Sequence, residues 1–192
     1  MKKVIKLVIF CIFIGCFVYL GTIHADESKK KKSISGTDND KYFGSAYVFE
    51  EINHSKLLSK LNSKNQNMII YACFKDSNLC DSYGDVINDI ARIYEIDEIY
   101  YYDFKIDKKE NNATYQKIVN KLSSYLITDD LGNQDLHAPT LIFIKDSEVY
   151  MVLDDLALQH GKDANDKILS LELQEEKKEE LVNVMEGYLY NE

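Results

Sequence analysis

The segment "CFKDSNLC" holds the residues whose types and spacing could carry chemistry, namely Cys73, Ser77 and Cys80. An apolar run precedes the segment and a helical pattern follows it, so a strand here gives way to a helix. A cysteine at a helix N-terminus becomes a nucleophilic thiolate more easily, because the helix dipole and free N–H groups lower its pKa. Six residues separate the two cysteines, however, whereas a Cys-x-x-Cys dithiol has two between them.

Each of these residues has a structural and a chemical interpretation. Ser77 is a preferred helix N-cap, and its hydroxyl ionises far above neutral pH, so capping explains it. Cys80 is either a small buried apolar residue or the partner of Cys73 in a disulfide that closes an eight-residue loop. A disulfide suits an exported domain with two cysteines outside its first 25 residues, and the sequence leaves both interpretations open.

Strand-like and helix-like patterns alternate around this segment from residue 45 onward. Apolar and β-rich runs predict strands at 45–52, 67–74, 98–106, 140–146 and 148–155. Apolar residues at helical spacing predict helices at 54–64, 81–96, 112–126 and 175–190, and residues 156–174 have no assigned element. The resulting order implies an α/β fold in which a mixed central sheet carries helices on both faces.

Pro139, the single proline of the chain, stands in "HAPTLIFIKDSEV" ahead of the predicted hairpin. This segment resembles the cis-proline loop and the following hairpin of the thioredoxin fold, and a cis peptide bond costs little only before proline. The helix that begins "CDSYGDVINDIA" aligns without a gap with the helix that follows the second cysteine of thioredoxin-like proteins. The resemblance implies that Cys80 takes the resolving-cysteine position and that Ser77 takes the position of the nucleophile.

The resemblance to the thioredoxin-like superfamily covers residues 45–155 and the last helix. The extra helix at 112–126 makes the outline similar to that of exported bacteriocin-transport accessory proteins. A thioredoxin-like domain at 45–192 is implied, with Ala138 and Pro139 as substrate-binding residues, because the family's cis-proline backbone pairs with a bound chain. The resemblance implies no cofactor.

Two further residues near the expected site bear on its activity. Tyr71 stands nine residues before Cys80, where many members of the superfamily have a buried acid that assists proton transfer. A tyrosine cannot act as that base at neutral pH. His137, two residues before the proline, is either a polar group of a substrate groove or a solvated loop residue.

The N-terminal segment predicts export. Three lysines within residues 2–6 precede an apolar run, so residues 1–25 read as a signal sequence or as a membrane anchor that spans the membrane through residues 4–23. Retention of the segment as an anchor is the expectation, and lipidation near Cys16 and cleavage after Ala25 are the alternatives. Lysines 29–32 weaken the orientation signal, yet we expect a polar tether at 26–44 and an extracytoplasmic domain, anchored or secreted.

The charge of the chain limits its partners. The formal net charge is -9, and it becomes -12 without residues 1–25, which contain three lysines and no acid. Such a domain is repelled by nucleic acid, so no nucleic-acid partner is expected. No metal-ligand cluster or phosphate-binding loop stands out in the sequence, so no metal is expected either.

Three hypotheses about function follow. The first is an exported, membrane-tethered thioredoxin-like protein whose degenerate Ser-x-x-Cys site mainly serves to bind a protein or peptide at the cell envelope. The second is a thiol–disulfide oxidoreductase that uses Cys73 and Cys80 at their nonstandard spacing. The third is a structural subunit of a secretion or conjugation assembly, so whether the chain is an enzyme stays open.

Overall fold

The computed structural model describes residues 47–128, 132, 134–154 and 168–190. All of them belong to the larger of the two compact units of the chain, Asp38–Glu192. The predicted signal or anchor and the tether therefore lie outside the described residues, as do residues 156–167 of the unassigned segment. Within the part of the chain that is described, no helix has the length and apolar character needed to cross a membrane.

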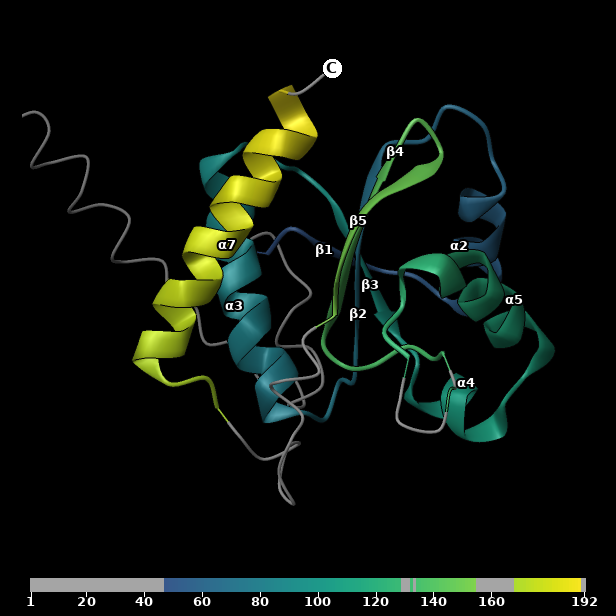
Figure 1. The fold of residues 1–192 in the computed structure, drawn as a ribbon. Coiled ribbons are helices and arrows are strands. Elements are labelled where there is room, and N and C mark those ends of the chain that lie inside the picture. The colour runs from purple at the N-terminus through teal and green to yellow at the C-terminus, as the bar shows by residue number, and fades with distance from the viewer. Residues whose placement is uncertain (1–46, 129–131, 133, 155–167, 191–192) are drawn as a thin grey trace, which may run out of the picture. The chain divides into compact units, whose positions relative to one another are not determined.

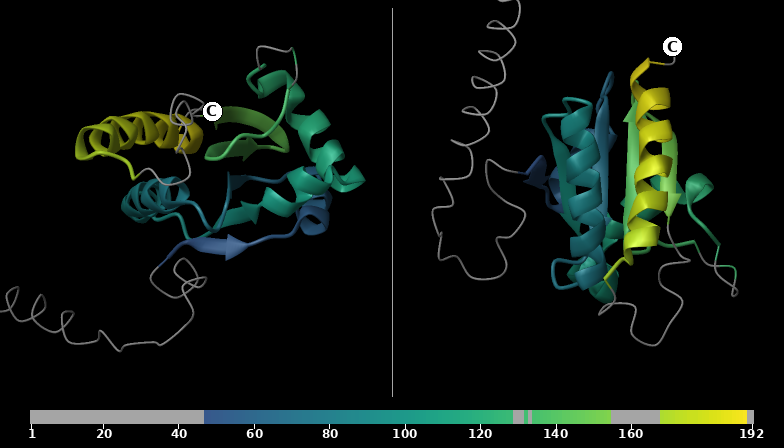
Figure 2. Two further views of the ribbon diagram at one scale, coloured as in Figure 1. Left: turned by 90° about the horizontal axis from the view of Figure 1, so that it is seen from below. Right: turned by 90° about the vertical axis from the view of Figure 1, so that its left-hand side faces the viewer.

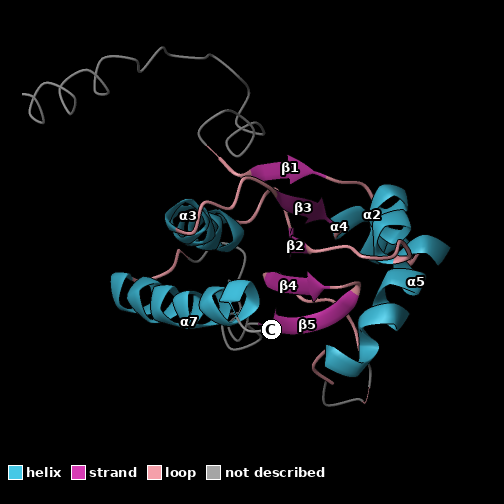
Figure 3. Ribbon diagram, turned by 90° about the horizontal axis from the view of Figure 1, so that it is seen from above, coloured by secondary structure: helices cyan, strands magenta, loops and turns pink. Residues whose placement is uncertain are grey.

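A five-stranded sheet forms the centre of this unit, in the order β1-β3-β2-β4-β5 (Figure 3). Strand β2 pairs in parallel with β3, which in turn pairs in parallel with β1. Strand β4 is antiparallel to β2, and β5 is antiparallel to β4, so the sheet is mixed. The strands are β1 Phe49–Glu51, β2 Met68–Cys73, β3 Ile99–Asp103, β4 Thr140–Lys145 and β5 Glu148–Asp154.

Helices cover both faces of the sheet (Figures 2 and 3). Helices α3 (Asn78–Ile93) and α7 (Leu171–Tyr190) lie side by side on one face. Helices α2 (His54–Leu61) and α5 (Ala113–Leu122) cover the other, where the short elements α4 (Lys105–Glu110) and η3 (Ser123–Tyr125) also lie. The two faces carry separate apolar clusters, as predicted for a mixed sheet with helices on both faces.

The central strand β2 explains why the sheet is buried on both sides. All six of its residues are buried, and successive side chains point alternately into the two apolar clusters. A continuous apolar run is what a strand covered on both faces requires. The sequence pattern therefore identified β2 correctly, and β2 carries Cys73 as its last residue.

Strand β1 and helix α4 differ most from the sequence-based expectation, and helices α3 and α7 begin three and four residues before their predicted starts. Strand β1 is only three residues long, although a strand was predicted at 45–52. Helix α4 was not predicted, because residues 105–110 have no apolar periodicity. It is held instead by Asp107, whose carboxylate accepts hydrogen bonds from Tyr102 Oη at 2.8 Å and Asn112 Nδ2 at 2.6 Å and lies 2.9 Å from His54 Nδ1.

The hairpin of β4 and β5 has the tight turn that the sequence predicted. Asp146 and Ser147 both have positive φ angles, 52° and 69°, as a two-residue hairpin turn requires. Farther along the strands, a register shift between Phe143 and Ile144 moves the pairing by one residue. As a result, Thr140 rather than Pro139 lies opposite Asp154.

Candidate functional site

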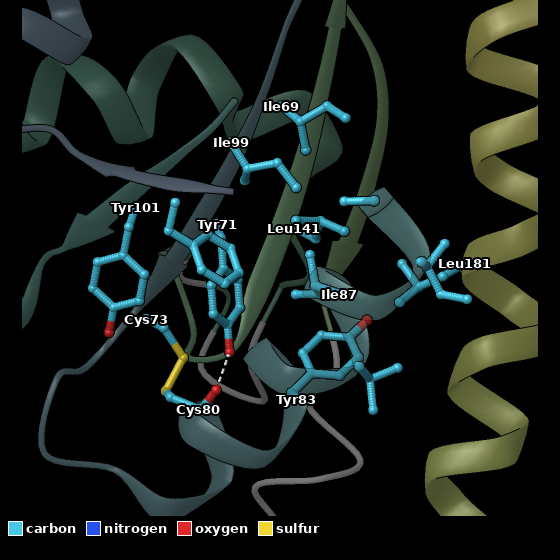
Figure 4. Close-up of a cluster of buried hydrophobic side chains, with 14 of the residues drawn as sticks. Ile69, Tyr71, Cys73, Cys80, Tyr83, Ile87, Ile99, Tyr101, Leu141 and Leu181 are labelled. Carbon is cyan, nitrogen blue, oxygen red and sulfur yellow. Dashed lines mark hydrogen bonds between the residues drawn. A yellow bond between two sulfur atoms is a disulfide. The ribbon is translucent and has the colours of Figure 1, made fainter. Parts of the chain in front are cut away.

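The three residues singled out in the sequence meet at the junction of β2 and α3. Cys73 ends β2, Ser77 is the N-cap of α3, and Cys80 lies in the first turn of that helix. Cys73 and Cys80 form a disulfide with a Cα–Cα distance of 5.9 Å (Figure 4). Cys80 is therefore the disulfide partner of Cys73, which was one of the two interpretations of this residue.

Ser77 has the geometry of a helix cap. Its backbone is extended, with φ -111° and ψ 117°, and its hydroxyl oxygen accepts a hydrogen bond from Cys80 N at 3.4 Å. The oxygen thereby satisfies one of the N–H groups that every helix leaves unpaired at its start. Ser77 is also buried, with an exposed fraction of 4%. The residue at the expected nucleophile position is therefore a structural cap.

Burial closes the disulfide to other molecules. The exposed fractions of Cys73 and Cys80 are 0% and 1%. Thiol–disulfide exchange requires a thiolate to reach one of the sulfur atoms, and its rate depends on that access. A bond sealed in this way stabilises the fold and is shielded from exchange while the domain stays folded.

Tyr71 closes the site from the sheet side. Its hydroxyl donates a hydrogen bond to the carbonyl oxygen of Cys80 at 2.7 Å (Figure 4). The ring lies 5.6 Å from that of Tyr101 and 6.1 Å from that of Tyr83, centroid to centroid, within a buried aromatic cluster. Burial raises the pKa of Tyr101 far above its usual value. The Tyr101 hydroxyl is therefore neutral at physiological pH and cannot accept a proton from a thiol.

The cis-proline loop reaches the same end of the sheet. The Ala138–Pro139 peptide bond is cis, and Thr140 follows as the first residue of β4. Thr140 pairs with Ala72, the neighbour of Cys73, so the loop lies beside the end of β2. Ala138 is partly exposed and packs against the apolar cluster that contains both cysteines, whereas Pro139 is buried.

His137 is not a solvated loop residue, because its side chain is mostly buried and has a buried partner. Its Nδ1 lies 3.0 Å from Oδ2 of Asp154, whose side chain is 2% exposed, while the histidine side chain is 14% exposed. The backbone oxygen of His137 accepts a hydrogen bond from Thr140 Oγ1 at 2.6 Å. Both contacts attach the cis-proline loop to the two strands of the hairpin. The sequence analysis missed Asp154, because the register shift that places it here leaves no sequence signal.

A second acid missed by the sequence analysis lies next to the disulfide. Asp103, the last residue of β3, is the sheet neighbour of Cys73. Burial raises the pKa of its carboxyl group, and a hydrogen bond from Lys105 N partly opposes that shift. The sequence "IYYYD" shows that Asp103 ends an aromatic strand. It does not show that this strand pairs with β2, which places Asp103 beside Cys73.

These features define a class. A central sheet in the order β1-β3-β2-β4-β5, a helix that begins at the end of β2 and a cis-proline immediately before β4 make this a thioredoxin-like fold. Ser77-Asn78-Leu79-Cys80 stands where the dithiol of that fold is expected. The described residues contain no group of three or more side chains that could hold a metal ion.

Comparison with solved structures finds a similar chain in thioredoxin O2 from Arabidopsis thaliana in its oxidized state. The two sequences are 17% identical, the TM-score is 0.43, and the match covers 76% of this chain and 96% of the other. No family model and no curated protein match the sequence. The similarity to bacteriocin-transport accessory proteins stays a prediction.

Proposed function

We propose that this chain is an extracytoplasmic, membrane-tethered thioredoxin-like protein that binds a protein or peptide at its cis-proline loop and does not exchange disulfides. The observation that carries the proposal is the closure of the Cys73–Cys80 disulfide, with a buried serine cap in the place of the nucleophile. A site that has the shape of a redox centre but no accessible sulfur can bind a protein chain but cannot exchange disulfides with it.

The cis-proline loop supports the binding role. Ala138 is partly exposed beside the buried Pro139, and the contact between His137 Nδ1 and Asp154 Oδ2 holds the loop against β5. A loop held in one conformation loses little entropy when an extended chain pairs with its backbone, and backbone pairing gives affinity without requiring one sequence. The expected partner is therefore an extended segment of an envelope protein or of an exported peptide.

The location is proposed from the sequence and is consistent with the disulfide. Disulfides persist in oxidising compartments, and this domain uses both of the cysteines outside residues 1–25 in a single bond. The lysines and the apolar run at residues 2–23 supply the export signal. Assistance to the export of a bacteriocin-like peptide is the more specific form of the proposal.

The oxidoreductase hypothesis is kept as a second candidate because of one contact. Phe74 N donates a hydrogen bond to Cys80 Sγ at 3.2 Å, and Cys80 lies in the first turn of α3. After reduction, this N–H group and the helix dipole would both stabilise a thiolate at Cys80. Reduction would first require the buried bond to open, which is the obstacle to this hypothesis.

A site-specific crosslinking experiment tests the binding role. The full chain is expressed with a photoreactive amino acid at Ala138 or, as the control, at Ile106, which is 66% exposed on α4. We expect a discrete protein adduct from position 138 that an excess of the unlabelled chain suppresses, and no such adduct from position 106. Equal adducts from both positions, or none from position 138, would overturn the proposal, and a structural subunit would then crosslink through other surfaces.

A further inference from the structure

The end of the sheet opposite the cis-proline loop contains a cavity of about 330 Å³. Strands β2 and β4 run between the two ends, a distance of roughly 17 Å for six-residue strands. In Figure 1 the C-terminal ends of α3 and α7 lie together at this end. The cavity is therefore separate from the disulfide site. It is lined by Asn67, Met68, Ile69, Glu95, Ile96, Asp97, Glu98, Lys145, Tyr188 and Leu189.

The floor of the cavity is apolar and fixed in place. Met68, Ile69 and Tyr188 are buried, while Ile96 and Leu189 are partly buried and pack against the core. The hydroxyl of Tyr188 donates a hydrogen bond to the carbonyl oxygen of Ile144 at 3.0 Å, which joins α7 to β4. The floor can thus accept an aliphatic group without rearrangement.

The turn after α3 builds the acidic wall. Glu95 has a left-handed backbone, with φ 54°, and the helix ends through a hydrogen bond from Ile96 N to Ala91 O at 2.8 Å. This turn directs Ile96 against the core and leaves Glu95, Asp97 and Glu98 exposed at the rim. A glycine is the usual residue in such a helix-ending turn.

The rim of the cavity is negatively charged. Three carboxylates line it against one ammonium group, that of Lys145. Burial and a hydrogen bond with Glu50 raise the pKa of Glu98, which means that two carboxyl groups lie close together at this side. An anion would be repelled here, whereas a cation would relieve the repulsion between the carboxylates.

We propose that this cavity binds the side chain of a lysine displayed by a protein partner. The aliphatic stem would lie on the apolar floor, and the ammonium group would be held by the carboxylates of the rim. Long cationic side chains commonly bury their methylene groups while the charged end stays near polar groups. This site does not depend on the proposed function, because it lies at the other end of the sheet, and both sites can be occupied at once.

A titration with a matched pair of small probes tests this site. The full chain in a neutral detergent carries ¹³C-labelled methyl groups on methionine and isoleucine, so that Met68 and Ile96 report on the floor by NMR. The probes are N-acetyl-lysine N-methylamide and N-acetyl-norleucine N-methylamide, which share a four-carbon stem and differ in the ammonium group. We expect saturable shifts of both methyl groups with the lysine probe and a roughly tenfold weaker response with the norleucine probe.

Variants of the rim show whether the carboxylates are responsible. The substitutions Glu95→Gln, Asp97→Asn and Glu98→Gln together should weaken lysine-probe binding roughly tenfold. Glu95→Gly alone should weaken it roughly two- to threefold without lowering the thermal midpoint, because glycine suits the left-handed turn. Equal shifts with both probes, no saturable shift with the lysine probe, or full binding by the triple variant would each overturn the proposal.

Discussion

The two ends of the central sheet differ in a way that the fold alone does not predict. At the end where β2 meets α3, the groups capable of chemistry are buried and already bonded: Cys73 to Cys80, and Ser77 to the start of its helix. At the opposite end, a turn between α3 and β3 leaves an open cavity with charged walls. The junction that resembles an active site is therefore buried, whereas the turn after α3 lines a cavity.

The end of the sheet that holds the disulfide contributes stability. A disulfide, a helix cap and a buried aromatic cluster all act there on the same short junction. Such concentrated stabilisation allows the partly exposed loop beside it to be held in one conformation. Mutations at this end should therefore change stability first, whereas mutations at the cavity end should change binding.

The largest expected effect follows from loss of the disulfide. Cys73→Ala removes a bond that spans a sequence separation of seven residues, and the loop-entropy estimate for such a loop is ~2.5 kcal/mol. We expect the free energy of unfolding to fall by about that amount in urea titrations. Wild type incubated with reductant but without denaturant is the control, and it should keep its disulfide, since both sulfurs are buried.

The second effect concerns the cis-proline loop. His137→Ala leaves Asp154, with its 2% exposed side chain, without its histidine partner, which should destabilise the domain by ~1–3 kcal/mol. The double variant His137→Ala/Asp154→Ala should recover part of this loss, because no unpaired buried carboxylate remains. Urea titrations of wild type, His137→Ala, Asp154→Ala and the double variant measure the coupling. Additive losses would show that the two side chains do not interact.

A smaller change of the opposite sign is expected at the cavity end. Glu95→Gly removes a side chain from a residue with φ 54°, and it should raise the free energy of unfolding by ~0.5–1 kcal/mol. Glu95→Ala keeps the backbone cost and removes the same carboxylate, so it is the matched control. Thermal unfolding of both variants separates the backbone effect from the charge effect, and a glycine variant less stable than the alanine variant would contradict the assigned turn.

The smallest effect is a dependence on pH at Asp103. Burial raises the pKa of its carboxyl group in the folded state, so the protonated form is favoured there. Its contribution to stability is therefore full below the unfolded-state pKa and is lost as the pH rises through the raised folded-state pKa. Relative to Asp103→Asn, wild type should lose stability from the acidic range toward neutral pH, as measured by urea titrations at several pH values. If wild type instead gained stability relative to Asp103→Asn as the pH rises, the burial of this carboxyl group would be contradicted.

Much of the fold was predictable because its elements carry strong local patterns. Local sequence alone determines the structure of three features, and each was identified from the sequence: the apolar run of β2, the periodic face of α3 and the Asp146-Ser147 turn. Helix α4 was missed, because Asp107 holds it through side-chain contacts with residues distant in the sequence.

The position of the site was predictable from the sequence, but the bonding of its residues was not. The proline and the frame of α3 placed Ser77 and Cys80 correctly relative to the helix start. Whether Cys73 could reach Cys80 depended on the path of the loop, which the sequence left open. The His137–Asp154 pair depends on a register shift in the hairpin, and the cavity depends on which turns meet at one end of the sheet. None of these has a local signature.

The most direct test of the central claim is an insulin-reduction assay on wild type and three variants. Wild type should stay at the uncatalysed rate, because neither sulfur is accessible and position 77 carries no thiol. Ser77→Cys alone should stay near that rate, because position 77 is buried and Cys80 is still bonded to Cys73, whereas Ser77→Cys/Cys73→Ala should gain activity, because Cys80 is then free to pair with the thiol at the helix N-terminus. Robust turnover by wild type that Cys73→Ser abolishes would contradict the account and establish Cys73 and Cys80 as a working dithiol.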